Sequence, residues 1–407
     1  MSRLLYLQSG GPTAVLNLSA QGVLETARAL GVSVCAAADG LAGLRDGRLL
    51  DCDALSADDL AALGRQPGAA FGSSRHILPP FDTAPQEWQQ LAAVLQHHDI
   101  RQILLNGGNG SMETALLLQQ LGERFSLPLT VVGIPKTIDN DLEATDFSPG
   151  FPSAAKYLAS SLREVLFDMR SMAQGRVFIL ETMGRHVGWL AAAGCLAALP
   201  DEAPPLLLLP EVAYDEARLF AAVHLQVARQ GYCAIVVSEG LRGADGRFVA
   251  QMHADTVYGH EQLGGAGNWL AQRIQQQLQL HAHVAVADCL QRAARHLLSA
   301  VDAHLAYEVG RKAVQWALAG QGGVMAAIER HDTADGCDWQ VVPRPLAEVA
   351  NRERALPADF IAASGLDVTP ACRAWLQPLL AGEVALPFTG GLPDMRRLHF
   401  PPLSSTP

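Results

Sequence analysis

Short apolar runs alternate with longer amphipathic stretches along most of the 407-residue chain. The runs are rich in Leu, Val and Ile and predict strands at 4–8, 32–36, 102–105, 129–134, 177–181, 206–209, 234–238 and 324–328. Between them, apolar residues recur at helical spacing and predict helices at 13–30, 87–97, 112–121, 153–167, 215–229 and 267–280. This alternation, with strands that are apolar on both faces, indicates a doubly wound α/β fold with mostly parallel strands.

Composition and charge narrow the class of protein. Hydrophobic residues make up 49% of the chain and charged residues 17%, which excludes global disorder, and the length suits two to three domains. Asp and Glu outnumber Lys and Arg by 41 to 30, and the resulting net charge of −11 disfavours binding to nucleic acid or to an anionic membrane. A phosphorylated ligand must therefore be held by a local group of basic side chains.

Cysteine usage and hydropathy predict a cytoplasmic protein. The seven cysteines are scattered and no CxxC pair occurs, so the sequence indicates neither a disulfide framework nor a thiolate zinc site. This usage fits a reducing compartment. No apolar stretch approaches the length of a membrane span, and the first residues lack the apolar run of a signal peptide.

Ligands of doubly wound folds bind beyond the carboxyl ends of the strands, so the strand-to-helix junctions hold the candidate chemistry. The first junction contains Gly10 and Gly11, and the second contains Gly107, Gly108 and Gly110. Glycines at the start of a helix let backbone N–H groups approach an anion, although a Gly-Gly turn alone is more often only a tight turn. Two such loops on one sheet edge favour a polyphosphate site.

The third junction, at 135–141, is the most specific. It supplies Lys136, Thr137, Asp139 and Asp141 directly after a predicted strand. Asp and Asn also form turns and helix caps, but a turn does not need a cation, a hydroxyl and two carboxylates together. Asp139 is suited to accept a proton from an attacking hydroxyl, Asp141 to hold Mg²⁺, and Lys136 to neutralise a transferring phosphoryl group.

The fourth junction places Arg185 beside Gly184, where a guanidinium can contact a phosphate or a sugar. Arg176 precedes the same strand, so it lies at the opposite end and is suited to serve the pocket of a neighbouring subunit. Further candidates elsewhere in the chain are Arg75, Arg292 and the carboxylate of Glu239.

These residues resemble the phosphofructokinases, which transfer phosphate from ATP or diphosphate to fructose 6-phosphate. The motifs PKTIDND at 135–141 and MGRHVGW at 183–189 are highly specific, and GGNGS and SEG support them. The resemblance covers roughly residues 4 to 330. The stretch LQRAARH at 290–296 and the chain length look most like the bacterial diphosphate-dependent branch.

The resemblance implies two Rossmann-like lobes with the active site in the cleft between them. The larger, donor-binding lobe would comprise 1–152 and about 290–340, and the smaller, sugar-phosphate-binding lobe about 153–289 with part of 341–407. It also implies a glycolytic, Mg²⁺-dependent enzyme that forms fructose 1,6-bisphosphate and assembles as a homo-oligomer, either a dimer or a tetramer.

The family's roles carry over position by position. Asp139 would be the general base for the C1 hydroxyl, with Lys136 and Thr137 beside it. Metal binding would fall to Asp141 and Asn109. The residues facing the donor would be Gly11, Arg75, Gly108, Asn109, Gly110 and Ser111. The residues facing the sugar phosphate would be Met183, Gly184, Arg185, Glu239 and Arg292, with Arg176 contributed across a subunit interface.

Three departures from the family pattern leave the donor and acceptor open. Diphosphate-dependent members usually have Asp where this chain has Gly110, so the open space favours ATP, whereas Lys136 and the overall branch favour diphosphate. Asn109 replaces a common metal-binding Asp. Cys289 replaces an expected His or Tyr near the sugar phosphate, which keeps sedoheptulose 7-phosphate as an alternative acceptor.

The sequence therefore predicts ATP as donor, with diphosphate as the alternative. A non-catalytic regulatory protein that binds a sugar phosphate stays open as a reading from another class, because Asn109 and Cys289 depart from the pattern. A Rossmann oxidoreductase is disfavoured, because no GxGxxG with a following acidic residue comes after the first strand.

Overall fold

The computed structural model describes residues 2–172, 174–257, 260–334 and 336–404. The chain forms two compact units. The first unit comprises Met1–Gly150, Ala293–Glu353 and Gly382–Pro407, and the second comprises Phe151–Arg292 and Arg354–Ala381. Each unit is built on its own sheet, and the chain crosses from one unit to the other more than once.

The first unit contains a sheet with seven strands among the described residues, in the order β13-β12-β5-β4-β1-β2-β3. The strands are β1 (Arg3–Gln8), β2 (Val34–Ala37), β3 (Leu49–Asp51), β4 (Ile100–Gly107), β5 (Thr130–Pro135), β12 (Val324–Thr333) and β13 (Gly336–Pro345). The five inner strands pair in parallel, and the edge strands β3 and β13 pair antiparallel. The predicted parallel α/β sheet is thus confirmed, with antiparallel edges that the sequence did not reveal.

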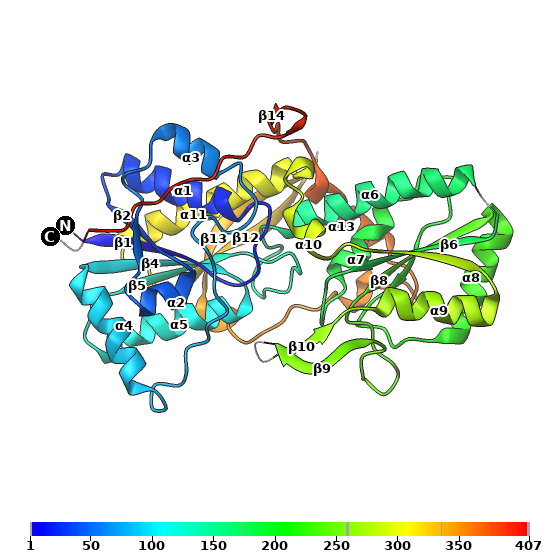
Figure 1. Ribbon diagram of the computed structural model, residues 1–407, viewed down its shortest axis with the longest axis horizontal. Helices are drawn as coiled ribbons and strands as arrows, with labels where there is room; N and C mark the ends of the chain where they lie inside the picture. The colour runs from blue at the N-terminus through cyan, green and yellow to red at the C-terminus, as the bar shows by residue number, and fades with distance from the viewer. Residues whose placement is uncertain (1, 173, 258–259, 335, 405–407) are drawn as a thin grey trace. The chain divides into compact units, whose positions relative to one another are not determined.

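Helices cover both faces of this sheet (Figure 1). On one face lie α1 (Leu16–Ala29) and α11 (Ala300–Leu318), with α3 (Ala57–Leu63) beyond them, and on the other lie α2 (Gly40–Arg45), α4 (Pro85–His97) and α5 (Asn109–Arg124). The short helix α12 (Leu346–Val349) packs beside α5. Strand β1 is buried along most of its length because helices lie on both sides of it.

The second unit has a four-stranded parallel sheet in the order β11-β6-β8-β7. Its strands are β6 (Arg176–Thr182), β7 (Leu206–Leu208), β8 (Tyr232–Ser238) and β11 (His281–Val286). Helices α6 (Phe151–Ser171) and α7 (Trp189–Ala193) lie on one face, and α8 (Glu216–Gln230) and α9 (Ala266–Leu278) on the other (Figure 1). Further elements here are the hairpin β9 (Gln251–Val257) and β10 (His260–Leu263), α10 (Asp288–Ala293) and α13 (Pro370–Leu376).

Some elements differ from the sequence-based expectation. Strand β11 was not predicted, because the histidines at 281 and 283 interrupt the apolar pattern of an edge strand. Helix α11 was not predicted either, although with 19 residues it is the longest of the described helices that pack on the first sheet. The helix expected from residue 13 begins at Leu16, because residues 14 and 15 form a turn. A small hairpin, β14 (Phe388–Thr389) and β15 (Leu392–Pro393), lies near the C-terminus.

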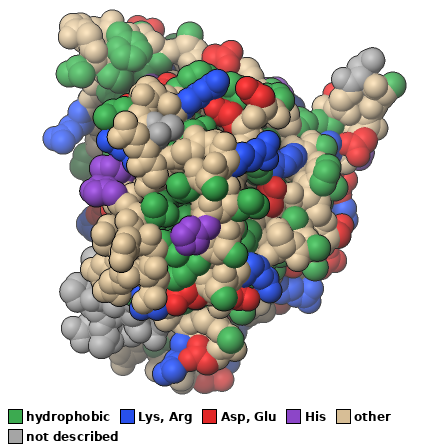
Figure 2. Space-filling view, turned by 90° about the vertical axis from the view of Figure 1, so that its right-hand side faces the viewer, with side chains coloured by type: hydrophobic (Ala, Val, Ile, Leu, Met, Phe, Trp, Pro, Cys, Tyr) green, Lys and Arg blue, Asp and Glu red, His purple; other side chains and the backbone are tan. Residues whose placement is uncertain are grey.

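The described helices include none that is both long and apolar enough to cross a bilayer. On the face drawn in Figure 2, Lys and Arg side chains are interspersed with Asp and Glu.

Helices α1 and α11 approach each other closely through two glycines. A Cβ atom on Gly22 would lie 2.2 Å from the carbonyl oxygen of Tyr307, and a Cβ atom on Gly310 would lie 2.2 Å from that of Ser19. Neither position has room for a methyl group, because the atom it would meet belongs to the backbone. The missing side chains therefore set the distance between the two helices.

We expect Gly310→Ala to destabilise the protein by about 2 kcal/mol or more, because the two helices must separate to admit the methyl group. The higher helix propensity of Ala, worth about 1 kcal/mol, offsets only part of this loss. Urea unfolding measures the difference. Gly110→Ala is the matched control, since Gly110 lies in helix α5 with nothing within 4 Å of an added Cβ. Equal stability of the two variants would contradict the proposed packing constraint.

Candidate active site

One group of candidate residues lies at the carboxyl ends of β1, β4 and β5. We call it the first-sheet cluster; its members are Gly11, Arg75, Gly108, Asn109, Gly110, Ser111, Lys136, Thr137, Asp139 and Asp141. Because the three strands are parallel neighbours, their ends and the loops that follow them share one edge of the sheet. The structure therefore brings together residues that lie up to 130 positions apart in the chain.

Lys136 joins two of these loops. Its Nζ donates a hydrogen bond of 2.6 Å to the carbonyl oxygen of Gly11, and its backbone N–H donates to the oxygen of Gly107. The side chain is only 3% exposed. Gly10, with φ +76, is also close, because a Cβ atom there would lie 3.4 Å from this ammonium. The glycine turn thus presses its backbone against a buried positive charge.

A tight turn orients the two carboxylates of the third junction. Asn140 is fully buried with φ +59, a left-handed conformation that Asn adopts more readily than most residues. Its Oδ1 accepts from the N–H of Ser148, and the hydroxyl of Thr137 accepts from the N–H of Asp139. These bonds fix the backbone on both sides of Asp139 and Asp141.

Asn109 and Asp141 present a pair of buried oxygen atoms. The amide of Asn109 donates to Asp141 Oδ2 at 2.9 Å and to the Asp141 carbonyl at 3.1 Å. The Oδ1 atoms of both residues are shut off from solvent and have no hydrogen-bond partner among the described residues. Burial raises the pKa of the Asp141 carboxyl, while the hydrogen bond from Asn109 lowers it. Two such oxygens suit a hard cation such as Mg²⁺, which completes its shell with water and ligand oxygens.

No group of three or more His, Cys, Asp or Glu side chains is placed to hold a metal within the described part of the chain. A closed, all-protein metal cage is thus not present in that part. A cation at the Asn109–Asp141 oxygens would depend on a bound ligand for its remaining coordination.

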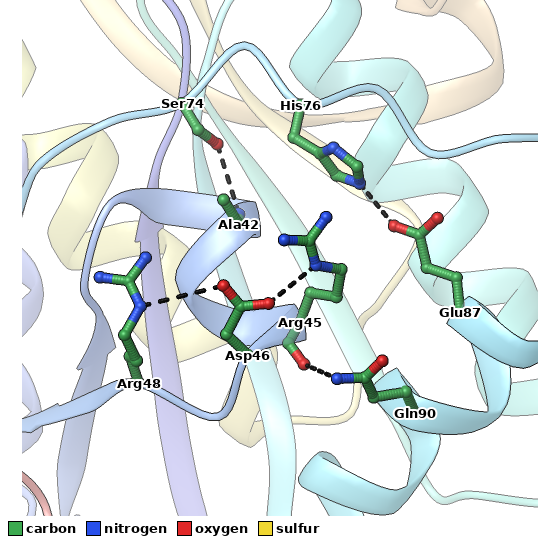
Figure 3. Close-up of polar contacts among 8 residues, drawn as sticks. All are labelled: Ala42, Arg45, Asp46, Arg48, Ser74, His76, Glu87 and Gln90. Atoms are coloured by element: carbon green, nitrogen blue, oxygen red, sulfur yellow. Dashed lines mark hydrogen bonds and ion pairs between the residues drawn. The ribbon is translucent and has the colours of Figure 1, made fainter.

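Arg75 lies on a loop, residues 66–75, that is fastened to its surroundings. The N–H of Gly10 donates to the carbonyl of Ser74, and the hydroxyl of Ser73 donates to the carbonyl of Gly10. Figure 3 shows further contacts: Ser74 Oγ accepts from the first turn of α2 at Ala42, and His76 lies 2.5 Å from Glu87 of α4. The exposed Arg75 side chain therefore extends from a backbone held on both flanks.

A second group of candidates lies at the carboxyl ends of β6, β8 and β11. We call it the second-sheet cluster; its members are Met183, Gly184, Arg185, Glu239 and Arg292. The loop after β6 fits tightly against the loop after β8, because a Cβ on Gly240 would lie 2.0 Å from the Arg185 carbonyl. Gly184 adopts φ +127, which other residues rarely reach, and Ser238 Oγ donates to its carbonyl at 2.5 Å.

Glu239 is a partly buried carboxyl beside Arg185. Burial raises its pKa to about 7; the backbone of Gly184 hydrogen-bonds it and lowers the pKa, whereas the negative charge of Glu181 raises it. The carboxyl is therefore near half-protonation at neutral pH, when it can act both as donor and as acceptor toward a hydroxyl group.

Helix α10 brings Arg292 to the same edge. Gln291, only 1% exposed, accepts from the N–H of Met183 at 3.3 Å and so ties α10 to the loop after β6. The guanidinium of Arg292 lies 3.2 Å from the Sγ of Cys289, which is exposed.

The structure does not bring Arg176 into the second-sheet cluster. It is the first residue of β6, whereas Met183 follows the other end of that strand. At about 3.3 Å per residue, the strand separates the two by roughly 20 Å. This position agrees with the inference from the sequence that Arg176 cannot serve the pocket of its own subunit.

Several residues that shape these clusters were not singled out from the sequence. Ser238 and Gln291 hold the loop after β6, and Ser73 and Ser74 hold the glycine turn. Ser238 directly precedes the candidate Glu239, and Gln291 directly precedes the candidate Arg292. This adjacency is the one signal in the sequence that could have pointed to them. Their partners lie 54 and 108 positions away, so the contacts themselves were not readable from the sequence.

The family model for phosphofructokinase matches residues 3–317. The chain belongs to the phosphofructokinase family. It is therefore a phosphotransferase of the 6-phosphofructokinase type, which depends on ATP or on diphosphate. Relatives named as phosphotransferases favour an enzyme over a non-catalytic regulatory paralogue of the family, and the family agrees with the two-lobed α/β fold expected from the resemblance.

Similar proteins include two enzymes named pyrophosphate–fructose 6-phosphate 1-phosphotransferase. The one from Methylococcus capsulatus is 48% identical and the alignment covers 96% of this chain and 94% of that protein. The one from Xanthomonas campestris pv. campestris is 46% identical, with 96% and 94% covered. A solved structure of pyrophosphate-dependent phosphofructokinase from Nitrosospira multiformis matches with a TM-score of 0.90 at 39% identity, covering 99% of this chain and 98% of the other.

We expect Glu239→Gln to remove part of the pH dependence of stability. The folded protein holds the Glu239 proton up to about pH 7, whereas an unfolded Glu loses it near 4.5, so this group lowers stability as pH rises between those values. The free energy of unfolding of the Gln variant minus that of wild type is therefore larger at about pH 8 than at about pH 5. Unfolding free energies measured across this range provide the check, and parallel curves for the two proteins would contradict the raised pKa.

Proposed function

We propose that the enzyme transfers a phosphoryl group from diphosphate to the C1 hydroxyl of fructose 6-phosphate, giving fructose 1,6-bisphosphate and phosphate in cytoplasmic glycolysis. The observation that carries the choice of donor is the name shared by relatives 46–48% identical over nearly the whole chain. Lys136 supports it as well. The sequence-based preference for ATP rested on Gly110, a single position, and we take diphosphate in its place.

In this reaction the first-sheet cluster binds the donor and performs the transfer. Asp139 accepts the proton of the C1 hydroxyl while the hydroxyl oxygen forms a bond to the phosphorus of diphosphate. The bridging P–O bond of diphosphate breaks at the same time and releases phosphate. Lys136, with Thr137 beside it, stabilises the charge on the phosphoryl group. Burial of this ammonium strengthens its field at the site, because little water screens it.

Mg²⁺ suits the Oδ1 atoms of Asn109 and Asp141, each of which is buried and has no hydrogen-bond partner in the described structure. Asp141 supplies the charge and Asn109 a neutral oxygen. When bound, the ion neutralises donor phosphate oxygens and fixes their orientation. The backbone N–H groups of Gly108, Asn109 and Gly110, at the start of α5, and that of Gly11 cradle the same phosphates, with Arg75 on their outer side.

The second-sheet cluster binds the sugar phosphate. Arg185 and Arg292 provide cations for its phosphate, and Glu239 pairs with sugar hydroxyls while Met183 and Gly184 line the loop. We further propose that the active form is a homo-oligomer, in which Arg176 of the partner subunit completes this cluster. The position of Arg176 at the amino end of β6 supports that step.

Parallel assays with diphosphate and ATP, each with Mg²⁺ and fructose 6-phosphate, test the donor. We expect diphosphate to support turnover at least about 10²-fold more efficiently than ATP, a gap of roughly 3 kcal/mol in transition-state stabilisation. Sedoheptulose 7-phosphate serves as a rival acceptor in the same assays, because the exposed Cys289 offers less hydrogen bonding than the expected His or Tyr. Efficient turnover with ATP alone would overturn the proposal.

Gly110→Asp sharpens this test. Nothing lies within 4 Å of a Cβ atom at this position, so a side chain can start there without displacing the protein. By the family pattern it occupies the space that the α-phosphate of ATP requires. A diphosphate-dependent enzyme keeps its turnover within about tenfold, whereas an ATP-dependent one loses it. Gly110→Ala controls for the loss of glycine.

We expect Asp139→Asn to lower kcat by about 10²-fold or more while the KM values change little, because the amide cannot accept the proton. The variant should keep its fold, since the bond from the Asp139 N–H to the Thr137 hydroxyl does not involve the replaced atom. Steady-state kinetics on the purified variant measures the effect. Turnover equal to wild type would remove Asp139 from the role of base.

A further inference from the structure

Four fully buried polar side chains lie beneath the first-sheet cluster and contact one another. We call them the inner polar network; they are Tyr6, Gln8, Asn17 and Asn106, each 0% exposed. The amide of Gln8 donates to Asn17 Oδ1 at 3.0 Å and to the Tyr6 hydroxyl at 3.4 Å, and Asn106 donates to the same hydroxyl at 2.9 Å. The network joins β1, β4 and α1.

The network also holds the 66–75 loop, at three backbone positions. Asn17 accepts from the N–H of Ala70 at 3.2 Å and donates to the carbonyl of Gln66 at 2.9 Å. Gln8 accepts from the N–H of Phe71 at 3.3 Å. The loop is thus fastened from inside at 66–71, and from outside at its far end by the contacts of Ser73 and Ser74.

Packing alone does not explain these side chains. Burying an amide costs free energy that its hydrogen bonds only roughly offset, and an apolar residue in the same place carries no such cost. Nor do the three bonds to the loop complete a helix or a sheet of the first unit. What they determine is the path of an otherwise irregular segment that ends at Arg75.

We propose that Asn17 and Gln8 are positioning residues for the donor, acting through Arg75. They hold the backbone at 66–71, so that the following residues reach the glycine turn and the Arg75 side chain starts from a fixed point. Neither residue touches the substrate in this scheme. The inference rests on the proposed function, since it takes Arg75 as a contact of the donor phosphates.

The test compares Asn17→Ala, Arg75→Ala and the double variant. We expect Asn17→Ala to raise the KM for diphosphate about tenfold while kcat and the KM for fructose 6-phosphate change less than about twofold. In the Arg75→Ala background the same substitution should add less than about twofold, because its effect passes through the missing guanidinium. Gln8→Leu, which removes only the bond to Phe71 and those within the network, should act in the same direction.

Gln226→Ala is the matched control, because Gln226 is a buried amide of the second unit with one hydrogen bond, to the Pro204 carbonyl. It should lower stability and leave the KM for diphosphate unchanged. A purely structural role for Asn17 would give this same pattern and overturn the proposal. So would a tenfold effect that persists in the Arg75→Ala background.

Failure of the proposed function has a different signature. If the wild-type enzyme shows no turnover with either donor, the proposed function fails. The positioning role of Asn17 is then tested by limited proteolysis and by calorimetric measurement of diphosphate binding. Cleavage within 66–75 should be faster in Asn17→Ala than in Gln226→Ala at equal unfolding free energy. Equal cleavage, with equal diphosphate affinity, would overturn the role of Asn17 as well.

Discussion

The contact between the Lys136 ammonium and the Gly11 carbonyl organises the first-sheet cluster. A charge that is 3% exposed must be surrounded by oxygen atoms or by an anion, and here the glycine turn after β1 supplies a backbone oxygen. That contact joins the ends of β1 and β5 across the intervening β4. The positive charge is in place before any ligand arrives, and a phosphate that enters meets a site whose dipoles need little rearrangement.

This arrangement explains how a protein of net charge −11 can hold polyanions. Its overall field repels them, but the field close to a buried cation is set by that cation and by the nearby helix start. The acidic groups at the same edge are also restrained. The amide nitrogen of Asn109 donates to the Oδ2 and to the carbonyl oxygen of Asp141, and the buried Oδ1 atoms of both residues have no partner among the described residues. A divalent ion bound there would offset the cost of burying these oxygens.

The sequence predicted the parts of the fold and of the candidate site that depend on local signals. Three such signals each lie within a few residues: Gly10 with Gly11, the run at 107–110, and the group from Lys136 to Asp141. The order of the strands in the sheet then brings the three together. Strand β11 was not predicted from the sequence, because edge strands tolerate polar residues such as His281 and so lack a clear apolar pattern. The path of the 66–75 loop could not be predicted, because it depends on Gln8 and Asn17, roughly 50 to 60 positions away. The expectation of ATP rested on a single glycine at position 110, whereas the diphosphate donor that we propose rests on relatives similar over nearly the whole chain.

The glycine contacts between α1 and α11 have a mechanical consequence. Because backbone meets backbone at Gly22 and Gly310, no side chain lies between the two helices at these two positions that could change rotamer and absorb a displacement. Helix α1 begins five residues after Gly11. A shift of the glycine turn when a ligand binds is therefore transmitted to α1 and α11 as one rigid body. The end of these helices away from the turn then moves together with the turn, instead of staying in place while the contact deforms.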